Sequence, residues 1–142
     1  MSHEPVEVVR EQYEATNARD FERAMDLYAD DVVLVVAESW GIGAGTYRGK
    51  VAVGEWFGDW FRQFAHDYRF EIEEARELDE GGVFLVARHT GTGRSSGAPI
   101  GSVSGYLYRV RAGKIVRTEL FHTPDEALEA ASRPEWSDPQ TH

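Results

Sequence analysis

The stretch from Val51 to Phe64, VAVGEWFGDWFRQF, constrains the fold of this chain more than any other part of its sequence. Its large apolar residues recur at steps of three and four, the spacing of one broad stripe on a helix: Val53, Trp56, Phe57, Trp60, Phe61 and Phe64. An aromatic stripe of this kind usually packs into a core. Because this one holds more large aromatic residues than packing on a sheet requires, Trp56 and Trp60, along one edge, are predicted to line a cavity.

The composition excludes several classes of protein. A length of 142 residues fits one domain with a substantial core, and a hydrophobic fraction of 42% argues against general disorder. The absence of cysteine excludes disulfides, thiolate metal sites and cysteine nucleophiles. A formal net charge of −10 would repel a phosphate backbone, so we expect no nucleic-acid partner.

Nothing in the sequence is typical of secretion or membrane insertion. The first 20 residues carry several glutamates and lack the apolar segment of a signal peptide. The longest apolar run, residues 32–37, is far too short to span a bilayer. We therefore expect a cytoplasmic protein with no membrane partner.

Apolar periodicity and turn residues divide the chain into helices followed by strands. Helices are predicted over residues 4–17, from the N-cap Asp20 to about 29, over 50–65 and from the Thr123 capping box to about 131. Strands are predicted over 32–37, 68–73, 83–90, 100–110 and 115–122, with a glycine-rich loop over 38–49. This order indicates an α+β fold in one domain, residues 1–132, with a loose tail over 133–142.

The glycine-rich loop contains partial matches to two cofactor-binding motifs, but neither motif is complete. The Gly45 and Gly49-Lys50 spacing is wrong for a P-loop, and Val51 stands where Ser or Thr should follow the lysine. The loop glycines do not form a dinucleotide-binding fingerprint either. No two of the five histidines have the spacing of helical metal ligands. We expect no cofactor and no metal.

Five short segments, in this order along the chain, carry a resemblance to a known family. They are Tyr13–Asp20 (YEATNARD), Leu27–Val32 (LYADDV), Tyr47–Gly49 (YRG), Gly113–Val116 (GKIV) and Asp125–Leu128 (DEAL). Together, over about residues 5–131, the chain resembles the SnoaL-like branch of the nuclear transport factor 2-like, ketosteroid-isomerase-like superfamily.

That resemblance implies a cone-shaped, curved antiparallel sheet wrapped around the long aromatic helix, with two further N-terminal helices and a short C-terminal helix. It also implies a homodimer formed through the outer face of the sheet. The superfamily contains isomerases, cyclases, epoxide hydrolases, dehydratases and binding domains. The fold alone therefore selects no activity.

The ketosteroid isomerase site is not retained at the matching positions. Its helix tyrosine falls at Gln12, its aspartate base at Val36 and its protonated late-strand aspartate near Gly105 or Tyr106. The Tyr106 hydroxyl could still donate a hydrogen bond.

The epoxide hydrolase and cyclase sites are not retained either. Arg88 fits the arginine of the limonene epoxide hydrolases, but Thr90 and Leu120 occupy their two aspartate positions. The late-strand aspartate of the SnoaL cyclases has no convincing equivalent. The mechanisms established for these enzymes therefore do not transfer to this chain.

Strand parity, combined with the resemblance, predicts which side chains point into the cone. Phe84, Val86 and Arg88 share one face of their strand, as do Thr118, Leu120 and His122 on the last strand. Tyr106 and Tyr108 share a face, although a one-residue slip would bring in their neighbours instead. The predicted pocket lining is Val36, Trp56, Trp60, Phe84, Val86, Tyr108, Thr118 and Leu120.

Four residues form the predicted catalytic set. Glu38 keeps inward parity two residues beyond Val36 and would act as general base, with Arg88 as electrostatic clamp. Tyr106 or His122 would donate to developing charge. In the alternative interpretation, Arg88 pairs with a glutamate on a rim and Glu38 is a solvated loop residue.

Two functions remain open at this point. One is a cofactor-independent isomerase, cyclase or hydrolase acting on a small apolar molecule. The alternative is a non-catalytic ligand-binding or dimeric interaction domain. A homodimer is further favoured because the parity above leaves Val83, Leu85 and Ala87 outside, on a sheet face too apolar for water.

Overall fold

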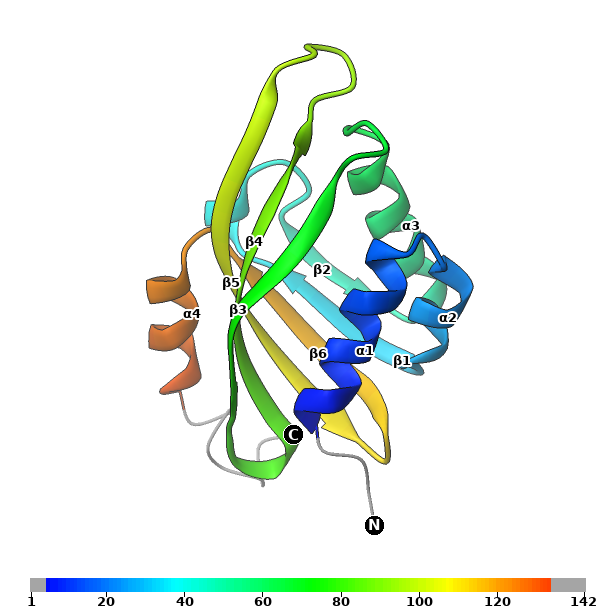
Figure 1. Ribbon diagram of the computed structural model, residues 1–142. Coiled ribbons are helices and arrows are strands. Elements are labelled where there is room, and N and C mark those ends of the chain that lie inside the picture. Colours follow the sequence, from blue (N-terminus) through cyan, green and yellow to red (C-terminus); the bar gives the residue numbers. More distant parts are fainter. Residues whose placement is uncertain (1–4, 134–142) are drawn as a thin grey trace.

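The structure is a computed structural model that describes residues 5–133 of the chain (Figure 1). Its helices are α1 (Pro5–Asn17), α2 (Phe21–Asp26), α3 (Lys50–Phe61) and α4 (Pro124–Ala131), with short 3-10 turns η1 (Glu38–Trp40) and η2 (Asp79–Gly81). Its strands are β1 (Tyr28–Val36), β2 (Gly45–Arg48), β3 (Arg69–Glu77), β4 (Gly82–Thr92), β5 (Pro99–Arg111) and β6 (Lys114–Phe121).

The six strands form one curved sheet in the order β2-β1-β6-β5-β4-β3. The predicted α+β class is confirmed, but the sheet is mixed because β1 lies parallel to β6 while the other neighbours are antiparallel. Two elements in the predicted loop over 38–49, η1 and β2, were not foreseen. The short strand β2 pairs with β1 at one edge of the sheet.

Helices cover both faces of the sheet (Figure 1). On the concave face, α1 and α3 pack with the main core, which includes Val9, Leu34, Val53 and Tyr106. On the convex face, α4 packs over a smaller core built from Phe84, Leu107 and Phe121. The cavity described below therefore lies on the side of α1, α2 and α3.

The turn between α1 and α2 fixes both helices near β3. Asn17, the last residue of α1, accepts a hydrogen bond from the backbone N–H of Phe70 at 2.9 Å and donates one to its carbonyl at 2.8 Å. Arg19 has a φ of 64°, a left-handed conformation that turns the chain sharply. Asp20 then caps α2 by accepting from the backbone N–H of Arg23 at 3.2 Å.

Helix α3 ends at Phe61, earlier than the apolar stripe suggested. The continuation of the stripe, Phe64, lies in the connection to β3 and is buried there. This connection, residues 62–68, forms part of the cavity mouth.

The face predicted for β4 is wrong. Val83, Leu85 and Ala87 belong to the main core on the concave face, whereas Phe84 and Val86 pack with α4 on the convex face. Every residue from Gly82 to Ala87 is buried, because α4 covers the face that would otherwise meet water. A strand that is apolar on both sides does not reveal by alternation which side faces the cavity.

The predicted capping box of α4 is confirmed. Thr123 Oγ1 accepts from the backbone N–H of Glu126 at 3.3 Å, and the Glu126 carboxylate accepts from the backbone N–H of Thr123 at 3.2 Å. The residues of the predicted tail from 134 onward lie outside the described part of the chain, so the division at 132 stays a prediction. None of the helices described over residues 5–133 is long and apolar enough to cross a membrane.

Candidate functional site

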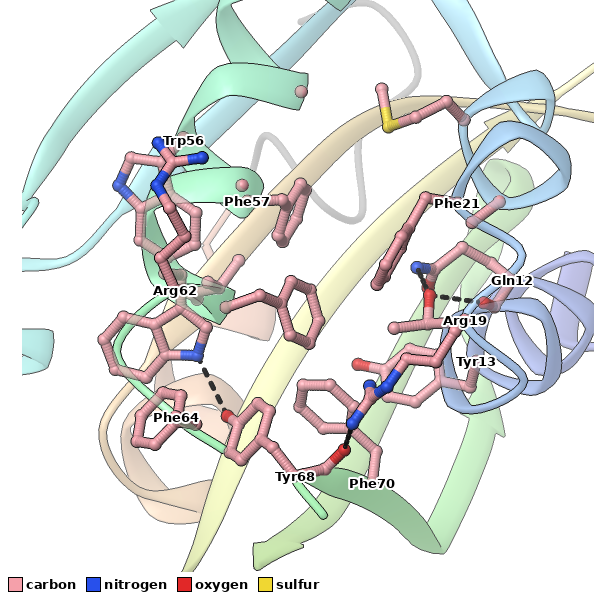
Figure 2. A pocket seen from close by; sticks show the side chains of 18 of the residues that line it. Gln12, Tyr13, Arg19, Phe21, Trp56, Phe57, Arg62, Phe64, Tyr68 and Phe70 are labelled. Carbon is pink, nitrogen blue, oxygen red and sulfur yellow. Dashed lines mark hydrogen bonds between the residues drawn. The ribbon is translucent and has the colours of Figure 1, made fainter. Parts of the chain in front are cut away.

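A cavity of about 580 Å³ opens between α1 and α2 on one side and α3 on the other (Figure 2). Its floor is the concave face of the sheet, where Tyr106, Tyr108 and Leu120 lie on β5 and β6. Aromatic side chains make up most of its walls. The volume falls within the range of pockets that enclose drug-sized ligands.

The α3 wall is a stack of indole and phenyl rings. Trp56 and Trp60 lie parallel, with ring centroids 5.7 Å apart and an interplanar angle of 6°. Trp40, from η1, packs against Trp60 with centroids 5.2 Å apart. Such mutual packing holds these large, flat apolar surfaces in place before any ligand arrives.

Trp56 is anchored by the glycine-rich loop. Its Nε1 donates to the carbonyl of Gly43 at 3.0 Å. Gly43 has a φ of 87°, and a Cβ built on it would lie 2.8 Å from that same nitrogen. The close approach of the loop therefore requires glycine at this position. This loop, which matched no nucleotide motif, positions an aromatic wall of the cavity.

A chain of hydrogen bonds runs from the cavity wall into the sheet. Trp60 Nε1 donates to Tyr68 Oη at 2.9 Å, and Tyr68 Oη lies 2.9 Å from His89 Nδ1. Because the indole can only donate, we assign the Tyr68 hydroxyl proton to the bond with His89, which leaves the histidine proton on Nε2. His89 Nε2 then faces Ser104 Oγ at 3.4 Å.

Burial shifts the pKa values of His89 and of the tyrosines in this region. Desolvation lowers the pKa of His89, with a further contribution from His122, and so favours the neutral imidazole required by the chain. Desolvation raises the pKa values of Tyr68, Tyr106 and Tyr108, which keeps these phenols protonated near neutral pH. They can serve as hydrogen-bond donors in an apolar cavity.

Two of the floor tyrosines differ in their partners. Tyr108 Oη lies 2.5 Å from the hydroxyl of Tyr13 on α1, so these two groups satisfy one another. The Tyr106 hydroxyl is buried without a partner at hydrogen-bonding geometry, although Ser104 is close enough to lower its pKa somewhat against the dominant effect of burial. An unsatisfied buried hydroxyl costs free energy that a ligand acceptor can recover.

Arginines, but no carboxylates, line the cavity. Among the described residues its lining includes Arg19, Arg62 and Arg94, together with His66, and contains neither Asp nor Glu. The three arginines come from the α1–α2 turn, from the C-terminal end of α3 and from the loop after β4. Within residues 5–133 no group of three or more His, Asp or Glu side chains has the arrangement of a metal site.

The structure brings together five of the residues predicted for the site. Trp56, Trp60, Tyr106, Tyr108 and Leu120 all line the cavity. Val36 and Thr118 are almost fully buried in the sheet and do not contribute to the cavity surface. The register of β5 is thus the one in which Tyr106 and Tyr108, and not their neighbours, share the concave face.

The remaining predicted residues lie elsewhere. Phe84 and Val86 pack under α4, and Arg88, on the same convex face, donates from Nε to the Glu73 carboxylate at 2.9 Å. This ion pair agrees with the alternative interpretation of Arg88. Glu38 is exposed at the start of η1, and the side chain of His122 is exposed beyond β6. Neither of these two lines the cavity.

Sequence reasoning missed the wall opposite α3. Gln12, Tyr13 and Thr16 of α1 line the cavity, as do Phe21 of α2 and Tyr68 before β3. The apolar spacing of Val6, Val9 and Tyr13 is the sequence signal that marks the buried face of α1. Phe21 is 43% exposed, unusual for a phenylalanine, because it borders the opening.

Comparison with known proteins identifies the family. The SnoaL-like domain family matches residues 9–118. Among proteins of curated function, none matches the chain.

Solved structures share the fold at low sequence identity. An NTF2-like protein from Burkholderia thailandensis is 24% identical, with a TM-score of 0.74 over 92% of this chain and 99% of its own. TerC, co-crystallised with polyporic acid, is 21% identical, with a TM-score of 0.73 over 89% and 97%. A Mycobacterium tuberculosis protein in complex with estradiol-17beta-hemisuccinate is 20% identical, with a TM-score of 0.71 over 87% and 97%.

The family match covers most of the chain, and these structures reproduce its curved sheet and helices over nearly their whole length. The protein belongs to the SnoaL-like domain family.

Proposed function

We propose that this protein binds a small, apolar, ring-bearing molecule in the aromatic cavity between α1, α2 and α3. The observation that carries the proposal is the cavity itself, about 580 Å³ with walls of stacked aromatic rings (Figure 2). Flat rings bind by stacking and by burial of apolar surface. Two proteins of similar fold were solved with ring compounds, polyporic acid and an estradiol ester.

Binding is favoured over catalysis because the cavity holds no carboxylate base. In the described residues its titratable groups are tyrosines, arginines and His66. The phenols of Tyr68, Tyr106 and Tyr108, whose pKa values burial raises, keep their protons near neutral pH. The described lining therefore offers no carboxylate that could abstract a proton from a bound substrate, and its single imidazole, that of His66, is exposed.

Thermal melting against a panel of apolar ring compounds tests this proposal. A ligand present at 100 times its dissociation constant adds about 2.7 kcal/mol to the unfolding free energy. For a domain of this size the melting temperature should rise by roughly 5–10 °C.

Two leucine substitutions on α3 give a matched comparison. Gly58 lines the cavity and a Cβ added there meets only the Arg62 side chain, at 3.6 Å, so Gly58→Leu should fill part of the cavity. Because leucine favours a helix more than glycine by about 0.8 kcal/mol, the variant should fold well. In Gly58→Leu the ligand should no longer raise the melting temperature. In Glu55→Leu, at an exposed position outside this cavity, the ligand should raise the melting temperature as it does in the wild type. Equal shifts in the two variants would contradict binding at this site.

Tyr106 supports a second candidate, a cofactor-independent isomerase, cyclase or hydrolase. Its hydroxyl is buried in the cavity floor without a hydrogen-bond partner of good geometry and could donate to a carbonyl oxygen that gains negative charge. Glu38, Arg88 and His122 have no part in this version of the mechanism. Once a ligand is found, Tyr106→Phe should reduce its conversion by roughly 100-fold or more while leaving binding within about threefold. Unchanged turnover would remove Tyr106 from the mechanism.

We also keep the proposal of a cytoplasmic homodimer formed through the outer sheet face. Its support is now the family resemblance alone, since Val83, Leu85 and Ala87 face the main core. Sedimentation equilibrium at micromolar protein concentration measures the oligomeric state directly. A monomer under these conditions would contradict the proposal.

A further inference from the structure

The mouth of the cavity carries positive charge in a protein whose formal net charge is −10. Arg19, Arg62, Arg94 and His66 all contribute to the lining, and no described carboxylate does. Acidic side chains outnumber basic ones in the chain as a whole, 25 to 15, so a lining with the opposite bias is a local feature.

Arg19 is held at the mouth by the backbone of residues 62–68. Its Nη2 donates to the carbonyl of His66 at 2.7 Å and also to the carbonyl of Tyr68 (Figure 2). The guanidinium lies over the ring of Phe61, 6.0 Å from its centroid. The left-handed backbone of Arg19, with φ at 64°, directs the side chain across from the α1–α2 turn.

Arg94 reaches the same segment from the loop after β4. Its Nη2 and Nε donate to the carbonyl of Phe64 at 2.9 and 3.2 Å. Neither Arg19 nor Arg94 has a carboxylate within 4.0 Å in the described part of the chain, so carbonyl dipoles hold two guanidinium groups whose charge is not neutralised. The buried Nη1 of Arg19 has no hydrogen-bond partner among residues 5–133.

Arg62 adds a more exposed charge. Among the described residues it pairs only with Asp59, one turn back on the same helix surface. An exposed pair of this kind contributes at most about 1 kcal/mol, so the arginine can exchange Asp59 for a ligand at little cost.

Resting on the ligand-binding function proposed above, we propose that the natural ligand is amphipathic and anionic: a carboxylate or sulfonate on an apolar ring body. The rings occupy the aromatic cavity. The acid remains at the mouth, beside Arg19, Arg62 and Arg94. Guanidinium groups suit such an acid because they form directed, charge-assisted hydrogen bonds with planar oxyanions.

Two fluorescent probes that differ only in charge test this assignment. N-phenyl-1-naphthylamine is neutral, and 1-anilinonaphthalene-8-sulfonate is the same ring system with one sulfonate. Fluorescence titration should give a dissociation constant at least about tenfold lower for the sulfonate, since one charge-assisted contact of roughly 1.4 kcal/mol accounts for that factor. The preference should weaken as salt is added, because the mouth is partly exposed.

Arginine variants test which positive charges bind the sulfonate. Arg62→Gln combined with Arg94→Gln should raise the dissociation constant of the sulfonate about tenfold and change that of the neutral probe less than twofold. Arg10→Gln removes the same charge from the exposed side of α1, outside the cavity lining, and should alter neither constant. Arg94→Lys keeps the charge and should retain most of the preference for the sulfonate over the neutral probe. Thermal melting of each variant checks that it is folded.

The outcomes separate this inference from the function on which it rests. If the two probes bind equally to the folded wild-type protein, the anionic assignment is wrong while the apolar cavity stands. If the paired arginine variant weakens both probes alike, the arginines shape the mouth and do not bind the acid. If neither probe binds, ligand binding in this cavity is itself contradicted.

Discussion

At the scale of single residues, the hydrogen bonds of His89 join cavity wall and sheet. Tyr68 Oη accepts from Trp60 and bonds to His89 Nδ1, so loss of the imidazole would leave a buried hydroxyl without its acceptor. His89 is 7% exposed, and desolvation lowers its pKa below the ordinary value near 6.5. Its protonation is therefore coupled to folding.

The sign of that coupling follows from the lowered pKa. In the unfolded chain His89 takes up a proton near pH 6.5, whereas in the folded protein it stays neutral to lower pH. The unfolding free energy should therefore be highest above about pH 7 and fall below pH 6.5, by at most about 1.4 kcal/mol per pH unit from this group.

Urea unfolding between pH 7.5 and 5.5 measures this dependence. The variant His89→Asn keeps an acceptor for Tyr68 but cannot take up a proton in this range, so its unfolding free energy should vary less with pH. A wild-type slope that is unchanged in His89→Asn would show that His89 is not the responsible group.

At the scale of secondary-structure elements, the docking of α4 on β5 depends on the absence of a side chain at Gly105. A Cβ there would lie 2.7 Å from the Cβ of Ala127 and equally close to the Cα of Pro124. Such distances require α4 to move away from the sheet.

Gly105→Ala should therefore lower the unfolding free energy by about 1–3 kcal/mol. Gly101→Ala, on the same strand, is the matched control, because its Cβ would lie 3.7 Å from Thr90, an ordinary contact. Urea unfolding of both variants compares them. If Gly101→Ala costs as much as Gly105→Ala, loss of strand flexibility and not the position of α4 sets the cost.

Elements with a local signal could be predicted from the sequence. The capping box fixed the start of α4, the polar/apolar alternation of Phe70 and Ile72 indicated β3, and the aromatic stripe indicated α3. Trp56 and Trp60, which the same stripe led us to expect along a cavity, lie in the wall of this one.

Features that depend on long-range packing could not be predicted. The orientation of β4 depends on its packing with α4. Because α4 covers one face of β4 and the main core covers the other, both faces are apolar, and the sequence does not show which face lies toward the cavity. The cluster of Arg19, Arg62 and Arg94 comes from three segments that only the fold brings together. No spacing of residues along the sequence indicates that these three arginines lie close together.

At the scale of the whole molecule, one curved sheet separates two regions with different roles. Helix α4 covers part of its convex face (Figure 1), and its concave face forms the floor of the cavity between α1, α2 and α3. Arginines line this cavity in a protein whose formal net charge is −10. Together these features support the proposed binding of a ring compound in the cavity between α1, α2 and α3.

The most direct test of this function locates a bound ring compound by NMR. With N-phenyl-1-naphthylamine bound, intermolecular NOEs should connect its ring protons to the methyl groups of Met25 and Leu120, which line the cavity. NOEs to Val86 or Val103 instead, on the side of α4, would place the ligand on the convex face and contradict binding in the aromatic cavity.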